Sequence, residues 1–186
     1  MSAYVHPTAV VGENFKPAPF TLIDAEVVIG ANVITGSFVH LRYAANVADN
    51  VLVGDHVTVH DSAVIGAGCV IGDGAVIGRR PVSRVRDSDG SPSVSGAILG
   101  ARCIIGASVV ILGGVRAGDD CSVGDGSVVG QGCAIGAGCS IGRNVTIEPG
   151  ATVADGVSIG SGAFIGEGIA VQGDVPEAAV ALPDPE

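Results

Sequence analysis

The feature that most constrains the fold of this chain is an aliphatic residue that recurs every six positions. The repeat is clearest between Val53 and Gly78, where four of the five repeat aliphatics are followed by glycine. A helix has a period of 3.6 residues and a strand a period of 2, so neither element alone explains a period of six. One short strand plus one corner does, and three such hexads close a triangular coil. The spacing therefore predicts an all-β fold, a parallel β-helix shaped as a triangular prism of hexapeptide repeats.

The hexad register is unbroken from Val5 to Ile77 and again from Leu99 to Ile165. Leu99 follows Ile77 by 22 positions instead of six, which predicts that the extra positions form one insertion at a single corner. The inserted sequence, about 79–97, is rich in Arg, Ser, Asp and Pro, and we interpret it as an excursion loop.

Both ends of the chain depart from the regular repeat. The first three coils are degenerate, as the caps of solenoids usually are. From about 169 to 186 the hexads fade into a Pro-rich sequence, for which we predict a C-terminal tail. We expect a single domain over residues 1–186, with seven to nine coils.

The composition narrows the class of partner. Hydrophobic residues make up 47% of the chain but aromatic residues only 3%, so Val, Ile and Ala must build a core by repetition. The net charge of −10 argues against nucleic acid or an anionic membrane as a partner. We found neither an 18-residue apolar run nor a basic-then-apolar N-terminus, and a cytoplasmic location with no membrane association is the expectation.

Residues 18 positions apart should stack in such a prism, and this spacing groups several polar side chains. It places Arg42 under His60 and His40 on the strand one coil below, while His56 precedes the same strand as His60. We therefore expect three histidines and the root of the loop near one edge. His56 or His60 would serve as a general base, since imidazole titrates near neutrality. The alternatives are exposed surface histidines and a zinc site. For zinc the spacing of His40, His56 and His60 shows no match, so no metal is expected.

The excursion loop holds four of the nine basic residues, Arg79, Arg80, Arg84 and Arg86. Guanidinium groups suit phosphate oxygens, so these arginines predict an anion-binding loop. A solvated loop without a ligand is the alternative.

The five cysteines all precede a repeat aliphatic by two positions, where other hexads have Ala, Val or Ser. We predict that they are buried small hydrophobes, with Cys103, Cys121 and Cys139 in one file because they are 18 apart. A metal site lacks the paired spacing, and a disulfide is not expected in the cytoplasm. Pairs of glycines such as Gly72–Gly74 have no helix after them, so we interpret them as corners with unusual φ angles rather than phosphate loops.

The hexad pattern resembles the left-handed β-helix of the hexapeptide-repeat acyltransferases over nearly the whole chain. A finer resemblance is to the nucleotide-sugar N-acetyltransferases, carried by YVHPTAVVGE at 4–13, FVHLR at 38–42, VGDHVTVHDSAVI at 53–65, the loop, GARCIIGASVVILGGVRAGDDCSVGDGSVV at 100–129 and GDVPEAAVALPDP at 173–185. The chain departs from that family at His56, where Asn is frequent, at Gly173, where Lys is usual, and in extra coils over 130–166.

The resemblance implies an acetyl-CoA-dependent acyltransferase that N-acetylates an amino sugar on a nucleotide, and a homotrimer with active sites between subunits. It implies that His56 and His60 are catalytic. It further implies that His40, Arg42 and the loop arginines bind the acceptor, and that Gly113, Gly114 and Ser127 contact the acyl-CoA. Two alternatives stay open: O-acylation of a sugar or antibiotic hydroxyl, and a β-helix scaffold without catalysis.

Overall fold

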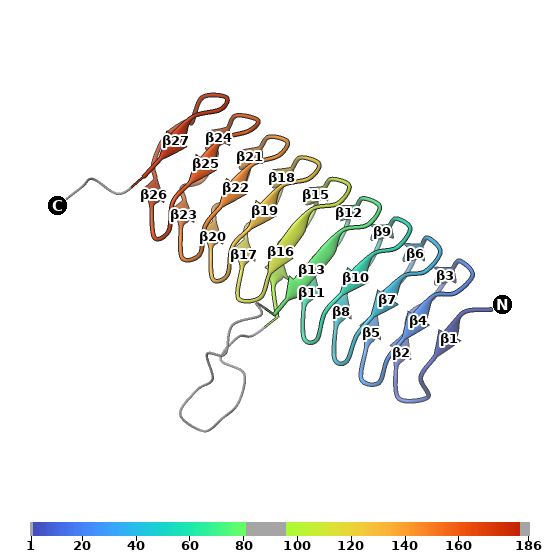
Figure 1. Ribbon diagram of the computed structural model, residues 1–186. Helices are drawn as coiled ribbons and strands as arrows, with labels where there is room; N and C mark the ends of the chain where they lie inside the picture. Colours follow the sequence, from blue (N-terminus) through green and yellow to red (C-terminus); the bar gives the residue numbers. More distant parts are fainter. Residues whose placement is uncertain (1, 81–95, 183–186) are drawn as a thin grey trace, which may run out of the picture.

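Three parallel sheets form the faces of a prism in the computed structural model, which describes residues 2–80 and 96–182 (Figure 1). Within these residues the chain consists of short strands and turns and contains no helix, hence none able to cross a membrane. Sheet A comprises β1 (Tyr4–Val5), β4 (Leu22–Ile23), β7 (His40–Leu41), β10 (Thr58–Val59), β13 (Val76–Arg79), β16 (Val110–Leu112), β19 (Val128–Val129), β22 (Thr146–Ile147), β25 (Phe164–Ile165) and β27 (Val180–Ala181). Sheet B comprises β2 (Val10–Val11), β5 (Val28–Ile29), β8 (Asn46–Val47), β11 (Val64–Ile65), β14 (Ile98–Leu99), β17 (Arg116–Ala117), β20 (Ala134–Ile135), β23 (Thr152–Val153) and β26 (Ala170–Val171). Sheet C comprises β3 (Lys16–Pro17), β6 (Ile34–Thr35), β9 (Leu52–Val53), β12 (Val70–Ile71), β15 (Ile104–Ile105), β18 (Ser122–Val123), β21 (Ser140–Ile141) and β24 (Ser158–Ile159).

The strand register confirms that one coil spans 18 positions of the sequence. His40 in β7 lies opposite Thr58 in β10, and Thr58 lies opposite Val76 in β13. Across the excursion Val64 lies opposite Ile98, so this one turn is longer than the others by the length of the predicted insertion. The coil therefore continues in register after the insertion. The fold is a left-handed parallel β-helix of about nine turns, as the hexads predicted.

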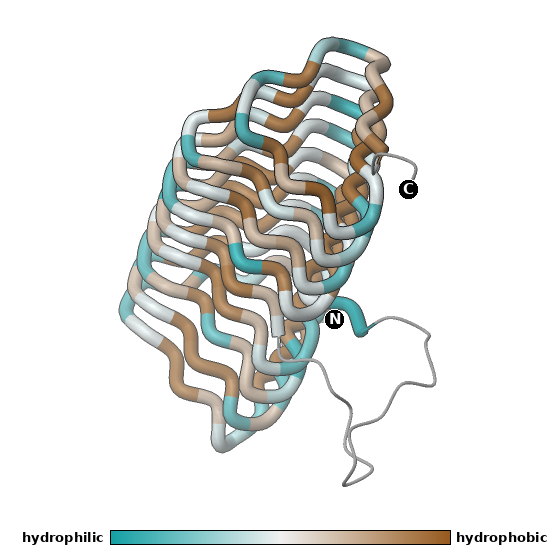
Figure 2. Tube along the Cα trace, turned by 90° about the vertical axis from the view of Figure 1, so that its left-hand side faces the viewer, coloured by the Kyte–Doolittle hydropathy of each residue, from teal (hydrophilic) through white to brown (hydrophobic). Residues whose placement is uncertain are grey.

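The core is a column of small aliphatic side chains, because each hexad directs its repeat aliphatic and the residue two positions earlier inward. From Ile23 to Val171 nearly all of these side chains are buried. Figure 2 shows hydrophobic and hydrophilic residues aligned in rows that run from coil to coil. The first coil has no coil below it, and Val5 and Val11 are accordingly exposed. Stacking of coils thus supplies the burial that a chain poor in aromatic residues needs.

The glycines of each hexad pair have two different roles, which corrects our expectation that all of them are corners with unusual φ. Gly74 does have a φ of 68°, in the left-handed region. Gly72 has no positive φ; instead, a Cβ there would lie 2.7 Å from the backbone of Gly106 and Ala107 in the next coil. The glycine after the repeat aliphatic is therefore required by the close approach of neighbouring coils, and only the second glycine by its backbone conformation.

Aspartates at many corners tie one coil to the next. In each case Oδ1 accepts a hydrogen bond from a backbone N–H in the coil below, at 2.6–2.8 Å. Because these carboxylates satisfy N–H groups that the sheets leave unpaired, they stabilise the corners as side-chain caps do. The residues are Asp49, Asp55, Asp73, Asp119, Asp125, Asp155 and Asp174.

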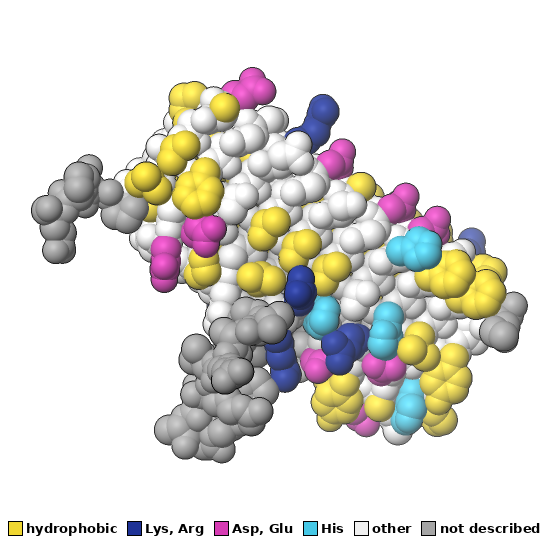
Figure 3. Space-filling model, viewed as in Figure 1, with side chains coloured by type: hydrophobic (Ala, Val, Ile, Leu, Met, Phe, Trp, Pro, Cys, Tyr) yellow, Lys and Arg dark blue, Asp and Glu magenta, His cyan; other side chains and the backbone are white. Residues whose placement is uncertain are grey.

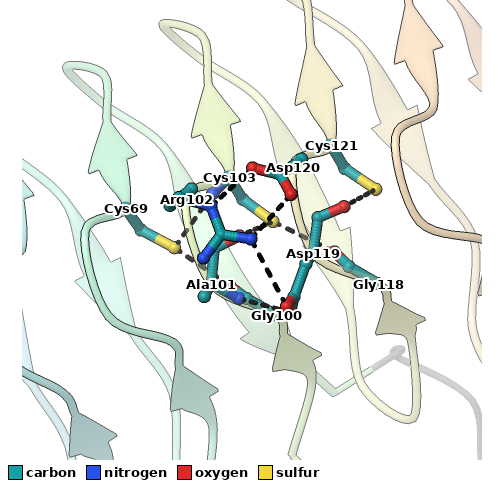
Figure 4. Close-up of polar contacts among 9 residues, drawn as sticks. All are labelled: Cys69, Gly100, Ala101, Arg102, Cys103, Gly118, Asp119, Asp120 and Cys121. Atoms are coloured by element: carbon teal, nitrogen blue, oxygen red, sulfur yellow. Dashed lines mark hydrogen bonds and ion pairs between the residues drawn. The ribbon is translucent and has the colours of Figure 1, made fainter.

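All five cysteines are buried and unpaired, as predicted. The register places Cys103, Cys121 and Cys139 in one file, and it adds Cys69 below them because the insertion lies between Cys69 and Cys103. Figure 4 shows three of these thiols beside the corner at which Arg102 forms a two-pronged ion pair with Asp120. Each thiol in the file donates to a backbone carbonyl oxygen, for example Cys69 Sγ to Gly100 O at 3.1 Å.

The segment expected to be a C-terminal tail instead completes a final coil. β26 pairs with β23 and β27 pairs with β25. Phe164 in β25 lies opposite Val180, so this last turn is two positions shorter than the regular coils. The shortened turn breaks the six-residue spacing, which is why the hexad pattern does not reveal it.

Candidate active site

Polar and charged side chains gather at the edge of the prism where the chain turns from sheet A to sheet B. We call this group the polar edge; it consists of Asp24, His40, Arg42, His60, Asp61 and Arg80. Figure 3 shows histidine, arginine and acidic side chains clustered together on this face of the molecule. The period of 18 brings them together from four successive coils.

His40 and Asp24 form the first contact of the polar edge. His40 Nε2 lies 2.9 Å from Asp24 Oδ2, and each side chain is 34% exposed. An ionised carboxylate can only accept a hydrogen bond, so Nε2 of His40 carries the proton that it donates. In the neutral ring Nδ1 then has a free lone pair. A carboxylate that orients an imidazole in this way is the arrangement of a general base.

His60 and Arg42 form the second contact, in which the imidazole accepts the hydrogen bond, whereas His40 donates one. Arg42 donates to His60 Nδ1 from a guanidinium nitrogen 3.0 Å away, because a guanidinium has no acceptor. The neutral His60 ring therefore carries its proton on Nε2. Burial, followed by the positive charge of Arg42, lowers the pKa of His60 below its ordinary value of 6.5. His60 is thus held as a neutral imidazole that offers an N–H donor.

Asp61 links the histidines to the foot of the excursion. Its Oδ1 lies 3.2 Å from Arg42 Nε, and its Oδ2 lies 3.8 Å from a terminal nitrogen of Arg80. Both pairs are partly exposed, so they add little to stability. Their effect is to hold two guanidinium groups beside His60, where they can bind an anion.

The chain leaves the prism immediately above His60. Gly78, with a φ of 78°, packs there: a Cβ on it would lie 3.0 Å from the Cβ of Ala63 and 3.7 Å from that of His60. The register of β13 against β16 shifts between Ile77 and Arg79. The structure thus confirms the expected position of the loop root over His60 and places Arg79 and Arg80 there. Arg84 and Arg86 lie outside the described residues.

The glycines expected at the acyl donor have different environments. The Gly113 N–H donates to Arg79 O at 2.9 Å, so it is not available to a ligand. Gly114 lies at the same edge as His60, on the second coil above it. Two coil spacings are about 10 Å.

Ser127 corrects the sequence prediction. Its side chain is fully buried, donates to Gly142 O at 2.8 Å and accepts from the Val145 N–H at 3.0 Å. It occupies the inward small position of its hexad, which the sequence also assigns to the cysteines. It therefore faces the core and cannot contact a ligand on the surface.

His56 lies away from the polar edge, which corrects the expected grouping of three histidines. His56 precedes β10 and His60 follows it, so the two occupy opposite corners of sheet A, about 13 Å apart along an extended strand. His56 is exposed at a corner with a φ of 58° and stacks on Phe38. The expectation counted positions along the chain and ignored that one strand separates the two corners.

Sequence reasoning missed Asp24 and Asp61. A signal for the first was present, because the residue after the repeat aliphatic is glycine in most hexads. At the edge between sheets A and B this position holds His6, Asp24, Arg42 and His60 in four successive coils. Such an exchange of glycine for polar side chains, confined to one edge, marks the surface where the fold presents chemistry.

Metal ligation finds no support in residues 2–80 and 96–182. No three His, Cys, Asp or Glu side chains among them converge in a way that would hold a metal ion.

Comparison with known proteins agrees with this architecture. The family model described as bacterial transferase hexapeptide (six repeats) matches residues 44–79 and 132–168. Both matched segments carry the six-residue repeat. No curated protein matches it in sequence.

Several solved structures also match this chain. LpxA, a UDP-N-acetylglucosamine acyltransferase from Bacteroides fragilis, is 24% identical over 94% of this chain and 68% of its own, with a TM-score of 0.42. LpxA from Acinetobacter baumannii is 15% identical over 98% of this chain and 70% of its own, with a TM-score of 0.51. The acetyltransferase domain of PglB from Neisseria gonorrhoeae is 16% identical over 96% of this chain and 53% of its own, with a TM-score of 0.38. The chain thus spans about half to seven tenths of their lengths.

Proposed function

We propose that this hexapeptide-repeat protein is a nucleotide-sugar acyltransferase that moves an acetyl group from acetyl-CoA to the amine of an amino sugar. The observation that carries the proposal is the His40–Asp24 pair beside the guanidinium groups of Arg42 and Arg80. A base and an anion site on one edge suit an acceptor with a nucleophile and a diphosphate. The acceptor class is carried over from the sequence resemblance to the nucleotide-sugar N-acetyltransferases.

The base would act at Nδ1 of His40. As the acceptor amine attacks the thioester carbonyl and the C–N bond forms, Nδ1 takes the proton that the nitrogen loses. Asp24 stabilises the imidazolium that results. When the C–S bond breaks, the same proton passes to the departing thiolate of CoA.

The oxyanion that forms on the carbonyl needs donors in place before the reaction. The Nε2–H of His60, whose tautomer Arg42 fixes, is such a donor at this edge. A lowered pKa suits His60 to this role, since its ring stays neutral at pH 7 and keeps the N–H on Nε2. Arg42, Arg79 and Arg80 would bind the diphosphate of the acceptor.

The acyl donor and the assembly belong to the same proposal. An exposed edge leaves the pantetheine of acyl-CoA without a second wall, and a neighbouring copy in a homotrimer would supply one. We keep the homotrimer as a proposal that the sequence resemblance supports, and the cytoplasmic location as a proposal from the sequence composition.

O-acylation is a second candidate, favoured by the His40–Asp24 pair itself. A hydroxyl is a far weaker nucleophile than a neutral amine, so it depends more on a positioned base. The same residues would then serve a sugar hydroxyl in place of an amine.

Release of free CoA thiol, followed with acetyl-CoA and matched UDP-sugars that differ only in bearing an amine or a hydroxyl, tests the proposal. His40→Gln and Asp24→Asn should each lower kcat about 10²–10⁴-fold without preventing acetyl-CoA binding. His6→Gln, a histidine at the same edge two coils below Arg42, is the matched control and should keep full activity.

Two outcomes would contradict the proposal. If His40→Gln keeps more than a tenth of the activity while His56→Ala loses it, the base is the residue that the sequence resemblance suggests. If the wild-type protein neither binds acetyl-CoA nor turns over any acceptor, the scaffold alternative is correct. A bound ligand at 100 times its Kd should add about 2.7 kcal/mol to stability, which a thermal-shift screen detects.

A further inference from the structure

Three aromatic rings form a ladder at the corner that leads from sheet C into sheet A. Phe20 and Phe38 stack with ring centroids 4.6 Å apart and planes 3° from parallel. Phe38 and His56 stack with centroids 4.8 Å apart and planes 2° from parallel. The spacing between rings equals the rise of one coil, so each coil adds one rung. We call this set of three residues the corner ladder.

The next rung above His56 has no side chain. Gly74 occupies it, and its N–H donates to Asp55 O at 2.8 Å, which fixes it directly over the His56 corner. A Cβ on Gly74 would meet only Ser108 Oγ, at 3.6 Å. Ser108 is the corner residue of the following coil, since its N–H donates to Asp73 O. The Ser108 hydroxyl therefore lies just above the Gly74 position, and the space between it and the His56 ring is about one rung thick.

The ladder is not explained by the needs of the fold. Left-handed φ is costly for bulky residues, and the other corners mostly use Gly, Asn, Ser, Ala or Asp there. Phe20 and Phe38 adopt φ of 63° and 58° and remain 44% and 50% exposed, so burial does not offset that cost. Aromatic rings kept exposed in a strained conformation indicate a surface for contact with a ligand.

The polar groups beside the vacant rung define the chemistry of that ligand. Asp55 and Asp73 flank it, and each uses Oδ1 to accept a backbone N–H, at 2.6 and 2.8 Å. Their Oδ2 atoms remain as acceptors, which select a ring with N–H or amino donors. Their negative charge repels a phosphate at this position. The ring must be planar, to stack on His56, and about one rung thick.

We infer that the vacant rung above His56 binds a nucleobase, stacked on the imidazole and hydrogen-bonded at its edge to Asp55, Asp73 or Ser108. The opposite corner of the sheet, about 13 Å away, holds the guanidinium groups of the polar edge. With its nucleobase at one corner and its phosphates at the other, a nucleotide would lie across sheet A. The base can come from a nucleotide sugar or from the adenine of CoA, and the inference does not depend on catalysis.

Nucleoside titrations followed by NMR test the site without any acyl transfer. Adenosine and uridine are the probes, and the ring protons of His56 should shift upfield as a base stacks on them. His56→Ala should weaken binding about 10-fold or more, since base stacking on an aromatic side chain is worth that much. Ala already occupies such corners at Ala44 and Ala178, so this variant should fold.

Gly74→His is the sharper variant, because it places a fourth ring in the vacant rung and should abolish nucleoside binding. Gly138→His is its matched control: Gly138 also has a φ of 68° and open space around it, but at another corner. The control should bind nucleosides as the wild type does. Circular dichroism shows whether each variant keeps the strand signal.

The outcomes separate the sources of the base from failure of the inference. Adenosine binding alone indicates CoA, uridine binding alone indicates the nucleotide sugar, and either supports the site. Absence of His56 shifts with both nucleosides, or wild-type affinity in Gly74→His, overturns it. Acyl transfer by the wild type together with either of these results would leave the proposed function standing and remove only this site.

Discussion

Replacing Gly66 by Ala should destabilise the prism far more than the same change at Gly138. A Cβ on Gly66 would lie 2.4 Å from both C and O of Gly100 in the next coil, about 1 Å inside ordinary contact. Gly66 also donates to Leu99 O at 2.9 Å, and a shift of about 1 Å would break this hydrogen bond. The lost bond costs about 1 kcal/mol and the overpacking about 1–3 kcal/mol.

The reduced entropy of the unfolded chain offsets about 0.4–1 kcal/mol of this cost, which leaves a loss of about 1–3.5 kcal/mol for Gly66→Ala. At Gly138 a Cβ would meet nothing within 4 Å, so only the left-handed φ of 68° matters. That conformation costs about 1–2 kcal/mol before the same offset, which leaves about 0–1.5 kcal/mol.

Urea unfolding followed by far-UV circular dichroism measures both variants, since the chain has no Trp for fluorescence. The midpoints should differ while the slope m stays the same. If Gly138→Ala proves as costly as Gly66→Ala, backbone conformation and not the approach of coils explains the glycines of the repeat. If Gly66→Ala is neutral, the coils adjust more freely than the close-packed geometry implies.

Three further results are expected. The pKa of His60 is lowered in the folded protein, chiefly by burial and then by Arg42, so the unfolded state binds the proton more readily and stability should fall as the pH drops below about 6.5. Arg42→Gln should raise the pKa of His60 in an NMR titration. An unchanged pKa would contradict the contact between Arg42 and His60. The buried thiols should react slowly with a thiol reagent in the native protein, because burial raises the pKa of Cys133 and Cys139. Rapid labelling of three or more cysteines would refute their buried placement. Asp155→Ala should cost about 1 kcal/mol in urea unfolding through loss of its bond to the Ala137 N–H, whereas a neutral effect would mean that water replaces the carboxylate.

The hexads predicted the fold because the six-residue period of the sequence marks the side chains that face the core. Each repeat aliphatic from Ile23 onward faces inward, and the gap between Ile77 and Leu99 measured the insertion correctly. The prediction failed where the period itself changes: the final turn, from Phe164 to Val180, is shorter than a regular coil, so Val180 fell outside the hexad count.

The site was only partly predictable, because the sequence period shows which residues stack but not where their side chains point. The spacing of 18 placed Arg42 under His60, and the contact is present. Hydrogen-bond polarity, however, depends on which nitrogen faces which partner, and no sequence pattern gives it. The pairing of His40 with Asp24 runs diagonally between columns and so escaped a count by 18.

The insertion at the edge of sheets A and B has a consequence for how this chain can change over time. Enlarging this corner by 16 residues, from about four to about twenty, costs only about 1–1.5 kcal/mol of chain entropy, because the cost grows with the logarithm of length. Since the coils above and below keep their register, the segment that leaves the prism over His60 can vary in length and sequence at little expense to folding. Changes in that segment can therefore accumulate while the prism stays the same.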